Sequence, residues 1–171
     1  MSDISLFEAS VPTEGAVASA YEWLLDLKIG TPTPEYVNAA DIDNLNPTFP
    51  PILRVRTGYA TKNKSYDDKA GENCVLTFDA EKIRIPESGG VAQPWLRALI
   101  KASHAKGAGN RVEARFYDAL DTTADGEAYE GIFRVEMVRK NTGYDASEWY
   151  TFTLTGYGEI DVVDSPVNAT A

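Results

Sequence analysis

The chain is poor in the two residue types that most often bind transition metals. Its 171 residues contain one cysteine, Cys74, and one histidine, His104. A lone cysteine cannot form a disulfide within the chain, and Cys74 is expected to be a small buried hydrophobe. A lone histidine leaves any His/Cys metal site short of ligands, and His104 is expected to be a solvated surface residue. The composition therefore predicts neither a metal centre nor a cofactor.

Long apolar runs are also absent from the sequence. No segment approaches the roughly 18 consecutive apolar residues that a membrane-spanning helix requires. Residues 1–20 have neither a basic start nor a continuous apolar stretch, so they do not signal ordinary secretion. The sequence predicts no insertion of this chain into a membrane.

Basic residues are outnumbered by acidic ones. The chain has 16 Lys and Arg against 26 Asp and Glu, a formal net charge of -10. This balance argues against a surface that grips phosphates, because nucleic-acid affinity comes largely from basic side chains that replace counterions. Hydrophobic residues make up 43% of the chain, enough for one sizeable core. A single domain is the natural expectation.

Alternation of apolar and polar residues predicts six strands and a shorter return segment. Leu25 and Phe78 fall on the apolar faces of two of these strands and are predicted to lie in the core. Turn-forming residues separate the strands, which favours an antiparallel two-sheet sandwich or partial barrel. The predicted strands are residues 21–29, 52–59, 74–83, 111–118, 129–140 and 149–157, with the return segment at 35–45.

One helix is predicted at residues 91–106. Trp95, Leu96 and Leu99 share one side at helical spacing, and Lys101 lies on the other. Pro94 suits the first turn and Gly107 suits the end of the helix. The predicted fold class is thus mainly β, with one flanking α-helix.

The remaining segments define the expected organisation of the chain. Residues 1–19 read as a polar N-terminal arm, 20–160 as the β domain, and 161–171 as an acidic C-terminal tail. Within the β domain, residues 58–73 have almost nothing to bury and are predicted to form a long polar loop. Ordinary hairpin loops need two to five residues, so a loop of this length is expected to be functional or disordered.

No motif in the sequence indicates an active site, and the chain is not expected to be an enzyme. The segment 121–127 matches the start of a calcium-binding loop, but its twelfth position is Ile132 instead of a bidentate glutamate. Strands are predicted on both sides of it, so it is interpreted as an acidic hairpin turn. Short-range pairs of acidic residues occur elsewhere, and they are interpreted as solvated groups and not as a hydrolase carboxylate pair.

The strand at 149–157 has no clear solvent face, because both of its faces carry side chains that favour contact with another element. Tyr150, Phe152 and Leu154 point one way, while Trp149 and the threonines point the other. The second face either meets the helix of a monomer or meets a neighbouring subunit. Closure of several copies into a ring would also hide sheet edges, which otherwise invite uncontrolled pairing.

The order of these parts, more than any single motif, resembles the major tail tube protein of long-tailed bacteriophages. The resemblance covers about residues 20–160. It is carried by Trp23 in the first strand, R-T-G-Y at 56–59 leading into the polar loop, the helix at 91–100, and T-L-T-G-Y-G at 153–158. It implies a two-sheet β fold with a flanking helix, assembled as stacked hexameric rings whose inner strands join around a channel. It also implies that the long loop and the N-terminal arm reach neighbouring rings.

Two groups of residues receive roles from this resemblance. A channel that DNA must slide through is expected to be hydrophilic and predominantly negative, so that phosphates are not held. Its lining is predicted to include acidic residues on the less apolar strand faces: Asp79, Glu81, Glu113, Asp41 and Asp43. The alternative for each of them is a position facing outside solvent. The inter-ring loop is predicted to use charges of both signs, from Lys62, Lys64, Asp67, Asp68, Lys69 and Glu72.

The expected partners are further copies of the chain, a tape measure protein, and terminator and tip proteins, with DNA passing through without specific binding. The expected location is the virion tail, assembled in the host cytoplasm. Two alternatives stay open. One is the tube of a related contractile injection or secretion system. The other is a monomeric carbohydrate-binding module that stacks sugars on Trp149, Tyr144 and Tyr157.

Overall fold

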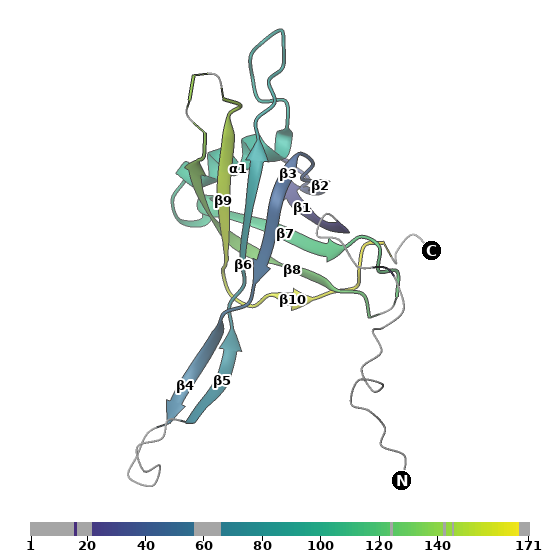
Figure 1. The fold of residues 1–171 in the computed structure, drawn as a ribbon, viewed down its shortest axis with the longest axis vertical. Coiled ribbons are helices and arrows are strands. Elements are labelled where there is room, and N and C mark those ends of the chain that lie inside the picture. Colours follow the sequence, from purple (N-terminus) through teal and green to yellow (C-terminus); the bar gives the residue numbers. More distant parts are fainter. Residues whose placement is uncertain are drawn as a thin grey trace, which may run out of the picture.

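A computed structural model describes residues 16, 22–56, 66–123, 125–141, 143–144 and 146–167. This part of the chain is mainly β and antiparallel and contains one α-helix, so the predicted fold class is confirmed (Figure 1). The elements are β1 (Trp23–Ile29), β2 (Glu35–Asn38), β3 (Ile42–Thr48), β4 (Pro51–Arg56), β5 (Tyr66–Glu72), β6 (Val75–Glu81), α1 (Pro94–His104), the 3₁₀ helix η3 (Gly107–Asn110), β7 (Arg111–Asp118), β8 (Ala128–Arg139), β9 (Trp149–Gly156) and β10 (Asp161–Val162).

Eight strands form one antiparallel sheet that bends at β8. The order is β2-β1-β7-β8-β9-β6-β3, and β10 also pairs with β8. The first half of β8 pairs with β7 and its second half pairs with β9. We call β2, β1, β7 and the first half of β8 the β7 section, and the second half of β8, β9, β6 and β3 the β9 section. In Figure 1 the strands β9, β6 and β3 run close to the long axis, and β7 and β8 cross them obliquely. The two predicted layers are therefore continuous through one strand.

The core lies between the two sections. Phe78 and Phe152 enter it from the β9 section with ring centroids 5.5 Å apart, and Phe116 and Leu25 enter it from the β7 section. Leu25 and Phe78 are 0% and 1% exposed, which confirms them as core residues. Cys74 is buried as predicted, and its burial, with a smaller effect of the Glu72 charge, raises the pKa of the thiol to about 11. The thiol is therefore protonated at neutral pH.

Helix α1 packs against the core that lies between the two sections. Trp95, Leu96 and Leu99 are buried in the same cluster as the strand residues, and the helix contacts β8, β1 and β7. Pro94 begins the helix as predicted, and Gly107 follows it with a φ of 59°, a left-handed conformation that glycine adopts without strain. Because α1 packs on the core side, it does not cover the threonine face of β9.

Three segments differ from the sequence-based expectation. The return segment is two strands: β2 pairs with β1, and β3 pairs with β6 after Asp41 turns the chain with a φ of 63°. The second half of the predicted loop 58–73 is β5, because backbone pairing with the apolar strand β4 overrides the low strand propensity of its Asp and Lys residues. The tail after residue 160 adds β10 to the sheet and buries Ser165. Residues 1–15 and 17–19 of the predicted arm lie outside the described residues.

Candidate assembly surfaces and a polar sheet face

The β9 section has one apolar face and one polar face. Phe78, Phe152 and Val135 point into the core and are at most 1% exposed. The residues that alternate with them point the other way, and those at the β8 end are accessible: Val138 is 67% exposed. The polar face contains Asp43, Asn46, Thr48, Thr77, Asp79, Glu81, Arg134, Glu136, Val138, Thr151, Thr153 and Thr155.

Asp79 is the best-connected group of this face. It is 6% exposed and accepts hydrogen bonds from the Thr151 hydroxyl (2.6 Å), the Asn44 amide (2.9 Å) and the Lys140 ammonium. Burial raises the pKa of the Asp79 carboxyl, but the three hydrogen bonds and the positive charge of Lys140 outweigh burial and hold the pKa below its usual value. Asp79 is therefore charged at neutral pH, and Lys140 offsets that charge.

Besides Asp79, three more of the five predicted channel residues lie in or beside the β3–β6 ladder of the β9 section. Asp43 is exposed and stands opposite Asp79, and Glu81 is half-buried at the end of β6, opposite Trp149. Asp41 lies in the turn that precedes β3, where its carboxylate accepts a hydrogen bond from the Gln93 amide at 3.3 Å. These positions leave the channel role of the three acids as a proposal.

Glu113 lies in the other section. It belongs to β7, and its carboxylate accepts hydrogen bonds from Lys28 Nζ at 2.8 Å and from the Tyr36 hydroxyl at 3.3 Å. These contacts, and the neighbouring ion pair between Arg115 and Asp26 at 2.9 Å, lie on the face of the β7 section that points away from the core. Glu113 is therefore separated from the acids of the β9 section by the whole core.

Sequence reasoning missed several groups on the polar face. Arg134 and Glu136 form an ion pair at 2.8 Å, with side chains 55% and 57% exposed. Their alternation with the apolar residues Phe133 and Val135 was the signal that places them on this face. Lys140 had no such signal, because its partner Asp79 is 61 residues away in sequence.

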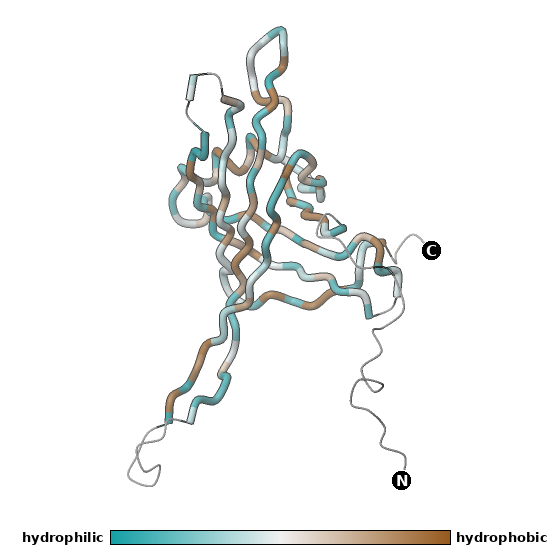
Figure 2. Tube along the Cα trace, in the orientation of Figure 1, coloured by the Kyte–Doolittle hydropathy of each residue, from teal (hydrophilic) through white to brown (hydrophobic). Residues whose placement is uncertain are grey.

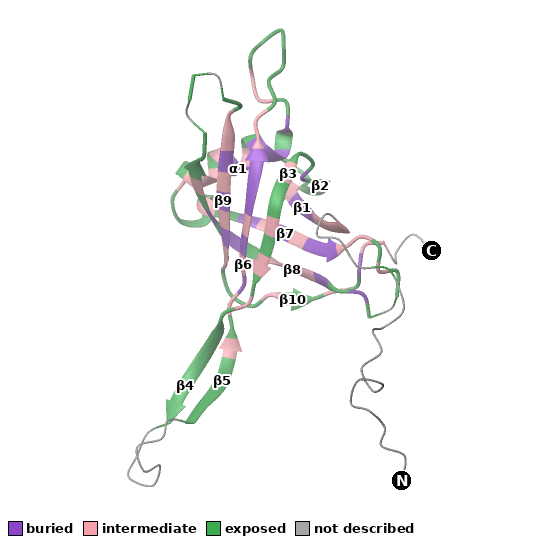
Figure 3. Ribbon diagram, viewed as in Figure 1, coloured by how far each residue is buried: buried purple, intermediate pink, exposed green. Residues whose placement is uncertain are grey.

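The hairpin of β4 and β5 projects from the end of the β9 section (Figure 1). Its residues are exposed except Gly71, which is half-buried, and Figure 3 shows the hairpin almost entirely in the colour of exposed residues. Four of the six predicted loop residues, Asp67, Asp68, Lys69 and Glu72, lie on β5. Lys69 pairs with Glu72, and Arg56 pairs with Asp68 at 3.8 Å. The other two, Lys62 and Lys64, lie outside the described residues.

Strand β4 exposes apolar side chains that no part of its own subunit covers in the described structure. Ile52, Leu53 and Val55 are 55%, 50% and 59% exposed, and Tyr66 on β5 is 57% exposed. Figure 2 shows β4 as a hydrophobic strand on an isolated two-stranded ribbon. Such a ribbon is marginally stable alone, and an exposed apolar strand marks an interaction surface.

The β9 section also has two strand edges without a strand partner in the described part of the chain. Strand β3 pairs with β6 on one side only. Residues 136–139 of β8 pair with β9, whereas the β7 ladder ends at Arg134. Unpaired edges are templates for further strands.

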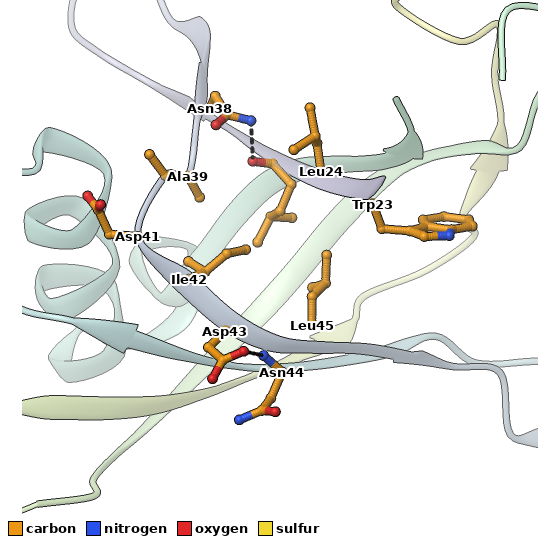
Figure 4. Close-up of a pocket in the computed structure, with 11 residues that line it drawn as sticks. Trp23, Leu24, Asn38, Ala39, Asp41, Ile42, Asp43, Asn44 and Leu45 are labelled. Carbon is orange, nitrogen blue, oxygen red and sulfur yellow. Dashed lines mark hydrogen bonds between the residues drawn. The ribbon is translucent and has the colours of Figure 1, made fainter. Parts of the chain in front are cut away.

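A cavity of about 310 Å³ opens between β1 and the start of β3. In Figure 4 the side chains of Ile42 and Leu45 point from β3 into the gap toward β1, while Asp43 and Asn44 point to the opposite side of β3. Ala40 and Asp41 lie along the same opening. The cavity thus has an apolar interior and an acidic segment beside it.

No cluster of three or more His, Cys, Asp or Glu side chains suited to a metal ion occurs among the described residues. No helix in the described part of the chain is long and apolar enough to span a membrane. Asp121 accepts hydrogen bonds from the Thr123 amide (3.0 Å) and hydroxyl (2.6 Å), as in the predicted acidic turn.

The described residues thus form a curved antiparallel sheet that has one polar face, two strand edges without a partner strand and a projecting hairpin. By sequence, no protein-family model and no curated protein matches the chain. By structure, the chain is similar to one in the tail of an empty GTA particle refined with helical C6 symmetry. The TM-score is 0.60 at 9% identity, covering 86% of this chain and 99% of the other.

A second similar chain comes from the six-fold symmetrised baseplate of the anti-feeding prophage. Its TM-score is 0.55 at 11% identity, covering 88% of this chain and 98% of the other. Both comparisons span nearly the whole of the other chain, so the likeness extends over the complete fold. The predicted resemblance to a protein of phage-type tails is confirmed at the level of the fold.

Proposed function

We propose that this chain is a structural protein that assembles into hexameric rings, and that the rings stack into a tail tube with a negatively lined channel for DNA. The observation that carries the proposal is the β9 section: a polar face opposite the core, bounded by two unpaired strand edges. Both similar chains belong to six-fold symmetric assemblies, which supports a ring of six.

Strand directions support closure of the ring through these edges. Strands β8, β9, β6 and β3 are successively antiparallel, so β8 and β3 run in opposite directions. The free side of β3 in one copy can therefore pair antiparallel with the free side of β8 in the next copy. This head-to-tail contact repeats in one sense around a ring and removes both edges.

In such a ring the polar face lines the channel. Asp43, Glu81 and Glu136 contribute negative charge, and Arg134 offsets part of it. The threonines between them offer hydroxyl groups without charge. A wall of this kind repels phosphates weakly, and its cations Arg134 and Lys140 are already paired with Glu136 and Asp79, which suits passage without capture.

The test is microscopy of the purified protein at increasing concentration. We expect rings or tubes with six-fold symmetry by negative staining, and an axial channel lined by β3, β6, β9 and β8 in a cryo-EM reconstruction. A protein that stays monomeric in sedimentation experiments at millimolar concentration would refute the proposal.

The proposal extends to partners and location. A tape measure protein would occupy the channel before DNA, and terminator and tip proteins would cap the two ends of the tube. The tube would form in the host cytoplasm and then belong to the virion tail. The N-terminal arm at 1–19 would contact a neighbouring ring. Tail particles isolated from infected cells and analysed by mass spectrometry would test each of these associations.

A second candidate is the tube of a contractile injection system, which the similarity to the anti-feeding prophage chain favours. A contractile sheath around the tube in electron micrographs would distinguish it. The carbohydrate-binding alternative is less well supported. Trp149 opens β9 and Tyr157 follows its other end, about 25 Å away for eight strand residues, so the two rings form no single stacking platform.

A further inference from the structure

We infer that the cavity between β1 and β3 receives strand β4 of a second copy in the neighbouring ring. This inference rests on the proposed function, because it assigns the surface on which one ring stacks. It identifies both halves of the contact: the apolar side chains of β4 as the inserted part, and the cavity beside residues 38–45 as the receiving part.

The two halves lie at opposite ends of one strand. Strand β3 begins at Ile42 beside the cavity and ends at Thr48, which leads into the hairpin. The hairpin continues away from the cavity (Figure 1), so β4 cannot fold back into the cavity of its own subunit. If a second subunit is displaced along the direction of β3, however, the cavity of the second subunit comes to lie beside the hairpin of the first subunit.

The chemistry of the two halves is complementary. Strand β4 combines the exposed apolar side chains of Leu53 and Val55 with two arginines and no acidic residue. The receiving segment 38–45 places Ile42 and Leu45 toward the cavity and Asp41 along its opening, and it contains no basic residue. Insertion removes apolar surface of β4 from water and places opposite charges beside each other.

Among the described residues, Arg54 and Asp41 have no ionic partner. Within the described residues, Arg54 makes no ion pair, although it stands across from Asp68 in the hairpin ladder. Asp41 accepts one hydrogen bond, from the neutral Gln93 amide, and is not in an ion pair in the described part of the chain. Both side chains are thus available to an adjacent copy.

The geometry also limits the spacing of the rings. From Ile42 at the cavity to Val55 in the hairpin the chain advances 13 residues of mostly extended backbone, at most about 45 Å at 3.2–3.4 Å per residue. The axial repeat of the tube must therefore not exceed this distance. A measured repeat clearly above about 45 Å would contradict the contact.

Disulfide cross-linking tests the contact directly. Val55→Cys and Ala40→Cys place thiols on the two halves at exposed positions, and the native Cys74 is 1% exposed. Oxidation of assembled V55C/A40C protein is expected to give a ladder of covalent multimers on non-reducing gels. V55C alone should give dimers at most, and the matched pair V55C/T122C, with Thr122 in the exposed β7–β8 connection, should give no ladder.

The outcomes separate this inference from the proposed function. Six-fold tubes of V55C/A40C without a ladder would overturn the contact and leave the tube proposal intact. Neither tubes nor a ladder at any concentration, for this variant and for the native chain, would overturn both. A faster-migrating monomer, produced by an intramolecular disulfide, would assign the cavity to the subunit's own hairpin and also overturn the contact.

A charge exchange provides an independent measurement. Arg54→Glu places a second negative charge beside Asp41 of the adjacent copy. The repulsion is expected to raise the critical concentration for tube growth roughly tenfold. Ala40→Lys, at the cavity mouth, should also weaken growth of the native chain by opposing Arg54. Combined, R54E/A40K should restore growth toward the native value. Equal growth of all four proteins would overturn the contact.

Discussion

Asp43 stands directly opposite Asp79 in the β3–β6 ladder, and Asn44 bridges the two carboxylates. The backbone N–H of Asn44 donates to the Asp43 carboxylate at 2.8 Å, and the side-chain amide of Asn44 donates to the Asp79 carboxylate at 2.9 Å. Like charges at directly opposite positions normally destabilise a sheet. The left-handed φ of 54° at Asn44, next to a bulge in the ladder, orients both donors. These hydrogen bonds stabilise two neighbouring acidic residues on the face that is proposed to line a negative channel.

Removal of Lys140 should weaken the fold through Asp79. Lys140→Ala leaves the buried Asp79 carboxylate with two neutral donors, and it should lower the free energy of unfolding by about 1–2 kcal/mol, since the lysine itself is half exposed. Urea denaturation at pH 7 measures the change. The matched control is Arg134→Ala, which removes an exposed ion pair on the same face and should change stability by less than about 0.5 kcal/mol. Equal effects would contradict the special role of Asp79.

Stability should fall in acid because of the same carboxylate. The folded-state pKa of Asp79 lies below its unfolded value of 3.8, so the unfolded state binds more protons as the pH falls. The contribution of Asp79 is therefore present above about pH 4 and is lost as the pH drops through the lowered folded value. Hydrogen bonding from Tyr150 likewise lowers the pKa of Glu148, which adds to the trend. Urea midpoints between pH 7 and pH 3 should decline less steeply for Asp79→Asn than for the native chain.

Truncation of a side chain to alanine should lower the free energy of unfolding strongly on the core face of β6 and only slightly on its polar face. Phe78→Ala empties a 1% exposed site and should lower the free energy of unfolding by about 3–5 kcal/mol, and Leu25→Ala by about 2–5 kcal/mol. Thr77→Ala on the polar face should cost less than about 1 kcal/mol. Thermal or urea unfolding by circular dichroism distinguishes the sites. A melting temperature unchanged by Phe78→Ala would place that residue outside the core.

Replacement of the hairpin should abolish tube growth without unfolding the subunit. Substituting residues 51–72 by an Asn-Gly turn removes exposed residues and joins β3 to β6 through a compact hairpin connection. The shortened protein should keep its circular dichroism spectrum and a melting temperature near that of the full chain. Electron microscopy should show no tubes, because the stacking contact is missing. Tubes of normal length would refute the role of the hairpin in stacking.

Reversal of charge on the polar face should make the tube retain DNA. Glu136→Lys combined with Thr153→Lys adds cations to the proposed channel wall, so filter binding should detect DNA held by assembled tubes at low salt. Retention should fall steeply as salt rises, because the binding releases counterions. Glu127→Lys, in the β7–β8 connection, serves as the matched control and should not retain DNA. Equal retention by both variants would show that the polar face does not line the channel.

Much of the local structure was predictable because it depends on short-range periodicity. The two-residue alternation around Phe78 and Phe152 assigns their strands and their core faces without any tertiary information. Likewise, Pro94 and the spacing of Trp95, Leu96 and Leu99 determine the helix. The hairpin strand β5 was missed, since its Asp and Lys residues have low strand propensity and pair only because β4 is beside them.

The candidate surfaces were less predictable. Glu113 alternates like Asp79 in sequence, yet the two carboxylates lie in different sections of the sheet, and only strand order separates them. The cavity beside β3 joins residues of β1 to residues of the following return segment across a gap that no local pattern encodes.

The amino-acid sequence by itself determined which residues alternate, where helix α1 lies and how negative the chain is, because these follow from the composition and from neighbours along the backbone. Tertiary structure alone decided that β8 serves both sections, that Lys140 neutralises Asp79, and that β4 is left exposed at the end opposite the cavity. Each of these depends on pairing between distant strands, whose register is set by the packing of the whole sheet.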